Sequence, residues 1–62
     1  MDDTDVLVER LLVLAGGLME DASAAAVLGE GVSVEQREAI VRQAHRDVGA
    51  LLEAMSVIRR GS

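Results

Sequence analysis

The feature that most constrains this chain is a short break at residues 29–33, which separates two long segments of helix-forming residues. Gly29 and Gly31 supply positions where a left-handed backbone conformation costs little, and helices commonly end at such positions. Ser33 and Gln36 then match a capping box, in which each side chain accepts a hydrogen bond from the other residue's backbone amide. A helix that ran straight through would be destabilised by about 1 kcal/mol per glycine and would also lose the cap. The break therefore predicts two separate helices.

We expect one domain over residues 1–62, with the first helix at about 4–28, the turn at 29–33 and the second helix at about 34–60. Asp3, Thr4 and Asp5 are all good amino-terminal caps for the first helix. A turn of four or five residues is usual between antiparallel helices. The predicted fold class is all-α, an antiparallel two-helix hairpin.

The apolar residues of the second helix alternate at spacings of three and four, which indicates a seam between helices packed at a shallow angle. Ile40 and Leu52 widen the seam on its two sides, and Glu38 and Arg42 should pair on the solvent side because they lie four residues apart. The seam itself consists of Val41, Ala44, Val48, Leu51, Met55 and Ile58.

The first helix carries two apolar stripes. One stripe, interrupted at Asp21, consists of Leu7, Leu11, Leu14, Leu18, Ala25 and Leu28. The neighbouring stripe consists of Val8, Leu12, Ala15, Met19, Ala22 and Ala26. One neighbouring helix cannot cover both, so an isolated hairpin is expected to leave Val8, Leu12 and Met19 in water. Burial of each such side chain is worth roughly 1.5–3 kcal/mol, so this surplus predicts association with another chain.

The short length of the chain also predicts association with another chain. A domain of 62 residues rarely gains more than ~3–5 kcal/mol from its own core, and without cysteine it has no disulfide to supplement that core. We therefore expect a homo-oligomeric four-helix bundle, with a dimer favoured over a tetramer because two-fold pairing is the commonest symmetry. The expected interface residues are Val8, Leu11, Leu12, Ala15, Leu18, Met19, Ala22, Val48, Leu51 and Met55.

This pattern resembles, in length and arrangement, the small plasmid-encoded Rop type, in which helical hairpins dimerise into an antiparallel bundle. The RNA contacts of that type rely on basic and aromatic residues, whereas this chain has a net charge of −5 and no aromatic residue. The resemblance therefore implies the bundle and not RNA binding, and nucleic acid is not an expected partner.

A membrane span and a signal peptide are not expected. The longest stretch without a charge is nine residues, 11–19, whereas a span needs roughly twenty apolar residues. The amino terminus is acidic at Asp2, Asp3 and Asp5, where a signal peptide would be basic. We expect a cytoplasmic protein.

No residue pattern supports catalysis, a metal site or a cofactor. His45 is interpreted as a helix-surface histidine, with a pH-sensing residue at a dimer axis as the alternative. A carboxylate-bridged metal site would need a glutamate three residues before it, where Arg42 stands. Asp21 and Arg37 lie where the regular spacing of the apolar residues is interrupted. Both are near helix ends, and they are interpreted as residues of fraying ends or as snorkelling side chains whose charged groups reach water.

The expected function is non-enzymatic self-association, as a structural or regulatory assembly element. The alternative is a small accessory or antitoxin-like subunit whose first-helix stripe binds a different protein. Gly16 and Gly17 stand in mid-helix at a cost of about 1–2 kcal/mol relative to alanine. They are interpreted as a bend, as a site of close approach by another chain, or as neutral changes.

Overall fold

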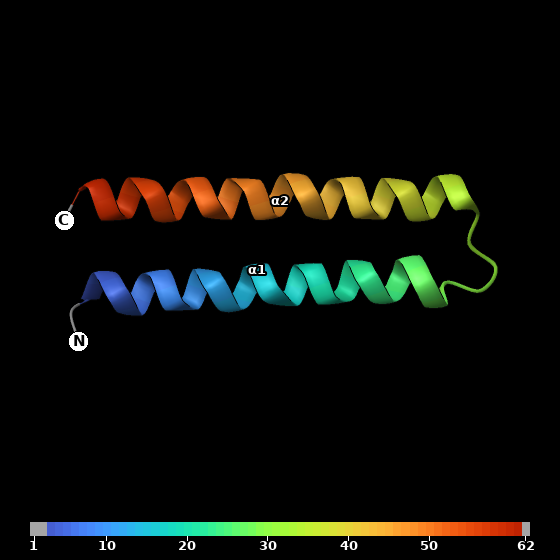
Figure 1. The fold of residues 1–62 in the computed structure, drawn as a ribbon, viewed down its shortest axis with the longest axis horizontal. Helices are drawn as coiled ribbons and strands as arrows, with labels where there is room; N and C mark the ends of the chain where they lie inside the picture. Colours follow the sequence, from blue (N-terminus) through green and yellow to red (C-terminus); the bar gives the residue numbers. More distant parts are fainter. Residues whose placement is uncertain (1–2, 62) are drawn as a thin grey trace.

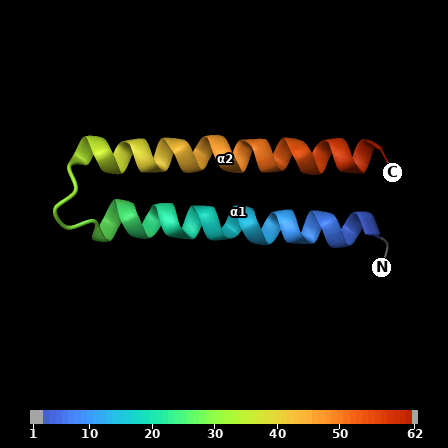
Figure 2. The ribbon, with the colours of Figure 1, turned by 180° about the vertical axis from the view of Figure 1, so that it is seen from behind.

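The computed structural model describes residues 3–61, and in this part of the chain it contains two helices, α1 (Asp3–Leu28) and α2 (Val34–Arg60), as Figure 1 shows. The helices lie side by side in both views, with the start of α1 next to the end of α2 (Figures 1 and 2). The predicted all-α fold and the antiparallel hairpin are therefore confirmed. The Cα atoms span 46 × 17 × 8 Å, so the molecule is a single layer of two helices.

The capping box predicted at the start of α2 is present. The Gln36 backbone amide donates to the Ser33 hydroxyl at 3.1 Å, and the Ser33 amide donates to Oε1 of Gln36 at 3.1 Å. The turn before it is closed by a hydrogen bond from the Val32 amide to the Gly29 carbonyl at 3.2 Å. The two ends of the turn are thus fixed by local hydrogen bonds before any packing between the helices is considered.

The two glycines of the turn have different reasons to be glycine. Gly31 has a φ of +76°, the left-handed conformation expected for it. The same expectation is wrong for Gly29, because Gly31 has the only positive φ among residues 3–61. A Cβ atom at Gly29 would instead lie 2.6 Å from the carbonyl oxygen of Ala25, closer than real Cβ atoms approach a neighbour. Gly29 is therefore required by close packing at the end of α1.

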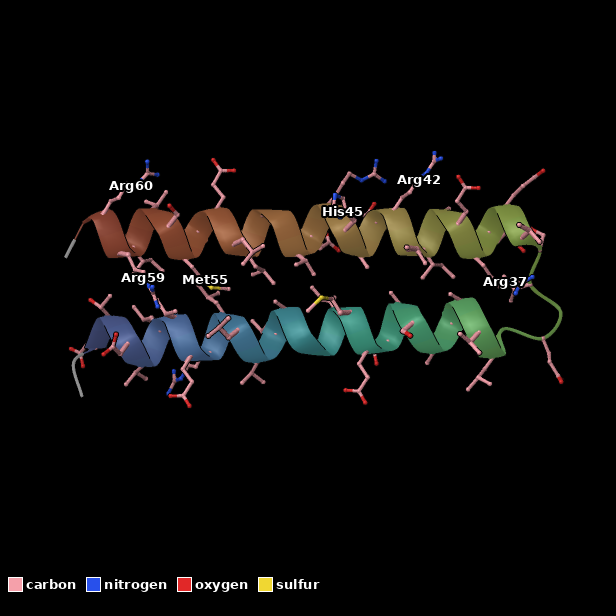
Figure 3. The ribbon with its side chains drawn as sticks, viewed as in Figure 1. Arg37, Arg42, His45, Met55, Arg59 and Arg60 are labelled. Carbon is pink, nitrogen blue, oxygen red and sulfur yellow. The ribbon has the colours of Figure 1, made fainter. Side chains whose placement is uncertain are left out.

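Arg37 holds the turn end of the hairpin together. Its Nη1 donates to the Ala26 carbonyl oxygen at 3.1 Å, and the side chain is half-buried with its Nε enclosed. Figure 3 shows the side chain near the connecting turn. The carbonyls in the last turn of a helix lack intrahelical partners, so a cation there is favourable. The interpretation of Arg37 as a snorkelling residue is therefore corrected: it bonds α2 to the carboxyl end of α1.

The core is small and lies on one line between the helices. Among residues 3–61 the buried apolar side chains are Val8, Ala15, Ala22 and Met55. Met55 points from α2 toward α1 in Figure 3. The seam predicted for α2 is largely confirmed, because Ala44, Val48, Leu51 and Ile58 are half-buried beside Met55, while Val41 is more open at 42% exposure.

The seam on α1 differs from the predicted one. Val8, expected in water in an isolated hairpin, is only 4% exposed, and Leu7 and Leu14 lie outside instead. The observed seam combines both predicted stripes; it consists of Thr4, Val8, Leu11, Ala15, Leu18, Ala22 and Ala25.

A physical reason for this choice is the residue at the middle of the hairpin. The predicted stripe would place Asp21 against α2, whereas the observed one places Ala22 there. Burying an ionised carboxylate without a partner is strongly unfavourable. The small side chains of Ala15 and Ala22 also allow a close approach of the two helix axes.

The start of α1 needs a smaller correction. Asp3, Thr4 and Asp5 were expected as caps, but all three lie within the helix, where Asp3 and Asp5 belong to the first turn. Negative charge there is favourable because it faces the positive end of the helix dipole. Asp2, Met1 and Ser62 lie outside the described residues.

Candidate interaction surface

The described part of the hairpin leaves a large amount of apolar side chain in water. Leu12, Met19 and Leu52 are each more than half exposed, as expected for Leu12 and Met19 in an isolated hairpin. The accessible surface is 4807 Å², whereas about 3,800 Å² is expected for a compact monomer of this mass. The radius of gyration is 14.4 Å, against about 10.6 Å expected for a compact domain of this length. Two helices therefore do not suffice to bury the apolar surface of this sequence.

One broad side of the hairpin, which we name the Met19 face, carries an apolar groove between the helices. The groove is lined by Met19, Ala22, Ser23, Val41, Ala44, His45 and Val48. Leu12 precedes Met19 by seven residues and Leu52 follows His45 by seven, so both lie along the same side of their helices. No carboxylate lines this groove.

The opposite broad side, which we name the Leu14 face, carries two grooves that contain acidic residues. One is lined by Leu14, Leu18, Asp47, Ala50 and Leu51, and the other by Leu18, Asp21, Ala22, Ile40, Gln43, Ala44 and Asp47. Ser23 on the first face and Asp21 on this one flank the buried Ala22 by about 100° on either side, which places the two faces on opposite sides of the seam.

On the Leu14 face the polar side chains are engaged with one another. Nε2 of Gln43 donates to Oδ1 of Asp47 at 3.0 Å, and Nη2 of Arg46 donates to Oε1 of Gln43 at 3.1 Å. These three residues form a chain of polar contacts along the edge of α2. The Leu14 face therefore carries polar side chains along much of the edge of α2, in addition to Asp21 on α1.

The expected interface residues divide into two groups in the hairpin. Val8, Ala15, Ala22 and Met55 are buried between α1 and α2, and Leu11, Leu18, Val48 and Leu51 are half-buried there. Leu12 and Met19 are the two that remain more than half exposed. Leu52 and Val41 were not among the expected interface residues, although Val41 belongs to the predicted α2 seam and Leu52 lies beside it.

The mid-helix glycines face open space. A Cβ atom at Gly16, Gly17 or Gly49 would meet nothing within 4 Å. Nothing in the hairpin itself therefore requires glycine at these positions. Gly16 follows Leu12 by four residues and precedes Met19 by three, so it lies beside the Met19 face. Gly17 is displaced by 200° from the buried Ala15, on the outer side of α1.

Several charged residues of α2, unlike Arg37, face away from α1. Glu38 and Arg42 form the predicted ion pair on the solvent side. Arg42 and Arg60 point away from α1 in Figure 3. An exposed pair of this kind contributes about 0–1 kcal/mol. Within residues 3–61 no three acidic or histidine side chains gather as a metal site would require.

α1 is also long and apolar enough to cross a membrane, judged by its length and composition. An 18-residue stretch of it reaches a mean hydropathy of 1.6, and 11% of that stretch is buried inside the hairpin. Low burial of an apolar helix is a property that a membrane span and an uncovered bundle helix share. The two cases differ in what must cover α1, either lipid or another protein surface.

No protein-family model matches this chain, and comparisons with curated proteins and with solved structures give no significant match.

Proposed function

We propose that this chain is a non-enzymatic self-association protein that forms a homodimeric four-helix bundle and serves as a structural or regulatory assembly element. The observation that carries the proposal is the excess accessible surface, 4807 Å² against about 3,800 Å² for a compact monomer. The difference of about 1,000 Å² is close to the ~800 Å² that each partner buries in an interface of standard size. A second hairpin laid against the first would supply the missing layer.

The position of two carboxylates favours a protein in the aqueous phase, rather than lipid, as the partner that covers α1. Glu20 and Asp21 stand side by side in the middle of the apolar stretch 11–28 of α1. An acidic residue at the centre of a spanning helix costs ~2.5–3.5 kcal/mol in insertion. In a two-layer bundle both carboxylates can remain in water, Glu20 on the outer side of α1 and Asp21 on the Leu14 face, so no such cost arises. We therefore propose a protein of the aqueous phase, consistent with a cytoplasmic location.

Thermal unfolding of the purified full-length chain, followed by circular dichroism at several protein concentrations, tests the proposal. A self-associating hairpin gains stability by mass action, so one cooperative transition is expected, with a midpoint that rises with chain concentration. Parallel flotation with phosphatidylcholine vesicles should leave the protein in the aqueous fraction.

Three outcomes would contradict the proposal, and each indicates a different replacement. A cooperative midpoint that does not depend on concentration would indicate a stable monomer. Helicity without a cooperative transition, or aggregation, would favour the accessory or antitoxin-like subunit, whose α1 surface needs a different protein. Flotation with the vesicles would indicate that lipid covers α1.

A further inference from the structure

We infer that the second copy of this chain docks on the Met19 face, so that the Met19 faces of two hairpins pack against each other and the Leu14 faces remain outside. This inference rests on the proposed self-association and names the surface that performs it. The Met19 face consists of Leu12, Met19, Val41, Val48 and Leu52, with Ser23 and His45 at its edges.

Charge distinguishes the two faces. Asp47 lines both grooves of the Leu14 face and Asp21 lines one of them, whereas no carboxylate lines the Met19 groove. Because a two-fold interface brings identical patches together, pairing through the Leu14 face would bring two copies of each carboxylate into one interface. Removing ionised carboxylates from water is strongly unfavourable, and Arg10, which shares a groove with Leu14, is one cation against Asp21 and Asp47 in each copy. Pairing through the Met19 face avoids this cost.

The Met19 face also has the layout of a self-complementary patch. Leu12 and Met19 lie equally far from the midpoint of α1, which runs from residue 3 to residue 28. Val41 and Leu52 lie on either side of the midpoint of α2, which runs from residue 34 to residue 60. A two-fold axis that lies in the interface plane and crosses the helices at their midpoints would therefore place each end of the patch of one copy over the opposite end in the other. Met19 is flexible and fills irregular gaps well in such an interface.

The space for a second copy comes from small residues beside the patch. Gly16 lies between the levels of Leu12 and Met19, and a Cβ atom there would meet nothing in the hairpin. The surplus surface is large enough, since about 1,000 Å² exceeds the ~800 Å² that one partner contributes to a standard interface. Charge and symmetry thus favour the same face, and the surplus area of the whole hairpin is large enough for one interface.

The test compares two glutamate substitutions on opposite faces that are matched in exposure and lie near each other along α1. Met19 is 54% exposed and Leu14 is 57% exposed, both lie near the middle of α1, and each lines a groove on its own face. Sedimentation equilibrium of the full-length chain should show that Met19→Glu raises the dimer dissociation constant by about a hundredfold or more, because the new carboxylate must be buried. Leu14→Glu should change it by less than about threefold.

A second pair of variants covers the case in which Met19→Glu abolishes folding together with dimerisation. The chain has no cysteine, so Ser23→Cys on the Met19 face and Ala50→Cys on the Leu14 face each introduce a single thiol at an exposed position. At concentrations where the chain is dimeric, the thiol of Ser23→Cys should be alkylated about tenfold more slowly than that of Ala50→Cys. Dilution to the monomer should remove the difference.

The possible results distinguish the choice of the Met19 face from self-association itself. Dissociation by Met19→Glu but not by Leu14→Glu, with protection of the Ser23→Cys thiol, supports the inference. A dimeric natural chain that is dissociated by Leu14→Glu and protects the Ala50→Cys thiol overturns the inference and leaves self-association standing. A natural chain that is monomeric at every concentration overturns the proposed function itself.

Discussion

At the residue scale, the geometry of the turn depends on two glycines, a capping box and one arginine. Gly31 supplies the left-handed backbone, Gly29 allows close contact with the Ala25 carbonyl, and Arg37 bonds across to α1. The cap at Ser33 fixes where α2 begins. These contacts fix how the turn joins the two helices. Only a narrow line of side chains is buried between the helices, so the core contributes less to their orientation.

Substitution of the turn glycines by alanine should destabilise the protein. Gly31→Ala forces a side chain into the left-handed region and should lower the free energy of unfolding by about 1–2 kcal/mol. Gly29→Ala should also destabilise, because its Cβ would lie too close to the Ala25 carbonyl oxygen. Urea unfolding measures both. Glu30→Ala, in the same turn but exposed, is the control and should stay within about 0.5 kcal/mol of the natural chain. Unchanged stability in Gly31→Ala would show that the turn adopts another conformation.

At the element scale, the two helices differ in how far their sequences determine their packing. α2 has one apolar seam, so its buried face followed from spacing alone, and its start followed from the capping box. α1 has apolar residues on several sides, so two stripes one residue apart were nearly equivalent by pattern. The observed seam places Ala22 rather than Asp21 against α2. This preference arises from the packing of α1 and α2 together and does not follow from α1 alone. The bond from Arg37 to Ala26 likewise required the register of the hairpin, which no local signal supplies.

The glycine pair of α1 also belongs to this scale. Gly17→Ala should raise the free energy of unfolding by about 1 kcal/mol, because glycine is a poor helix former and nothing lies within 4 Å of the new Cβ. Gly16→Ala should give a smaller gain, because this position borders the Met19 face, where we place the second copy. Chemical denaturation at a fixed chain concentration measures both. Equal gains at the two positions would indicate that both glycines face water, and a loss in Gly17→Ala would indicate close packing on the outer side of α1.

At the scale of the whole molecule, the hairpin has the form of half a bundle. It is one helix thick, with Cα extents of 46 × 17 × 8 Å, and apolar side chains lie on both of its broad faces. A domain normally buries its apolar faces between at least two layers. The uncovered faces are the basis of the proposal that a second copy packs against the hairpin.

Sedimentation equilibrium of the natural chain over a range of micromolar concentrations tests this claim most directly. A self-associating chain should show a mass of twice the chain mass of 6.5 kDa, or a multiple of it, and should dissociate on dilution. A cooperatively folded species of 6.5 kDa at every concentration, with Leu12 and Met19 still exposed to water, would contradict it.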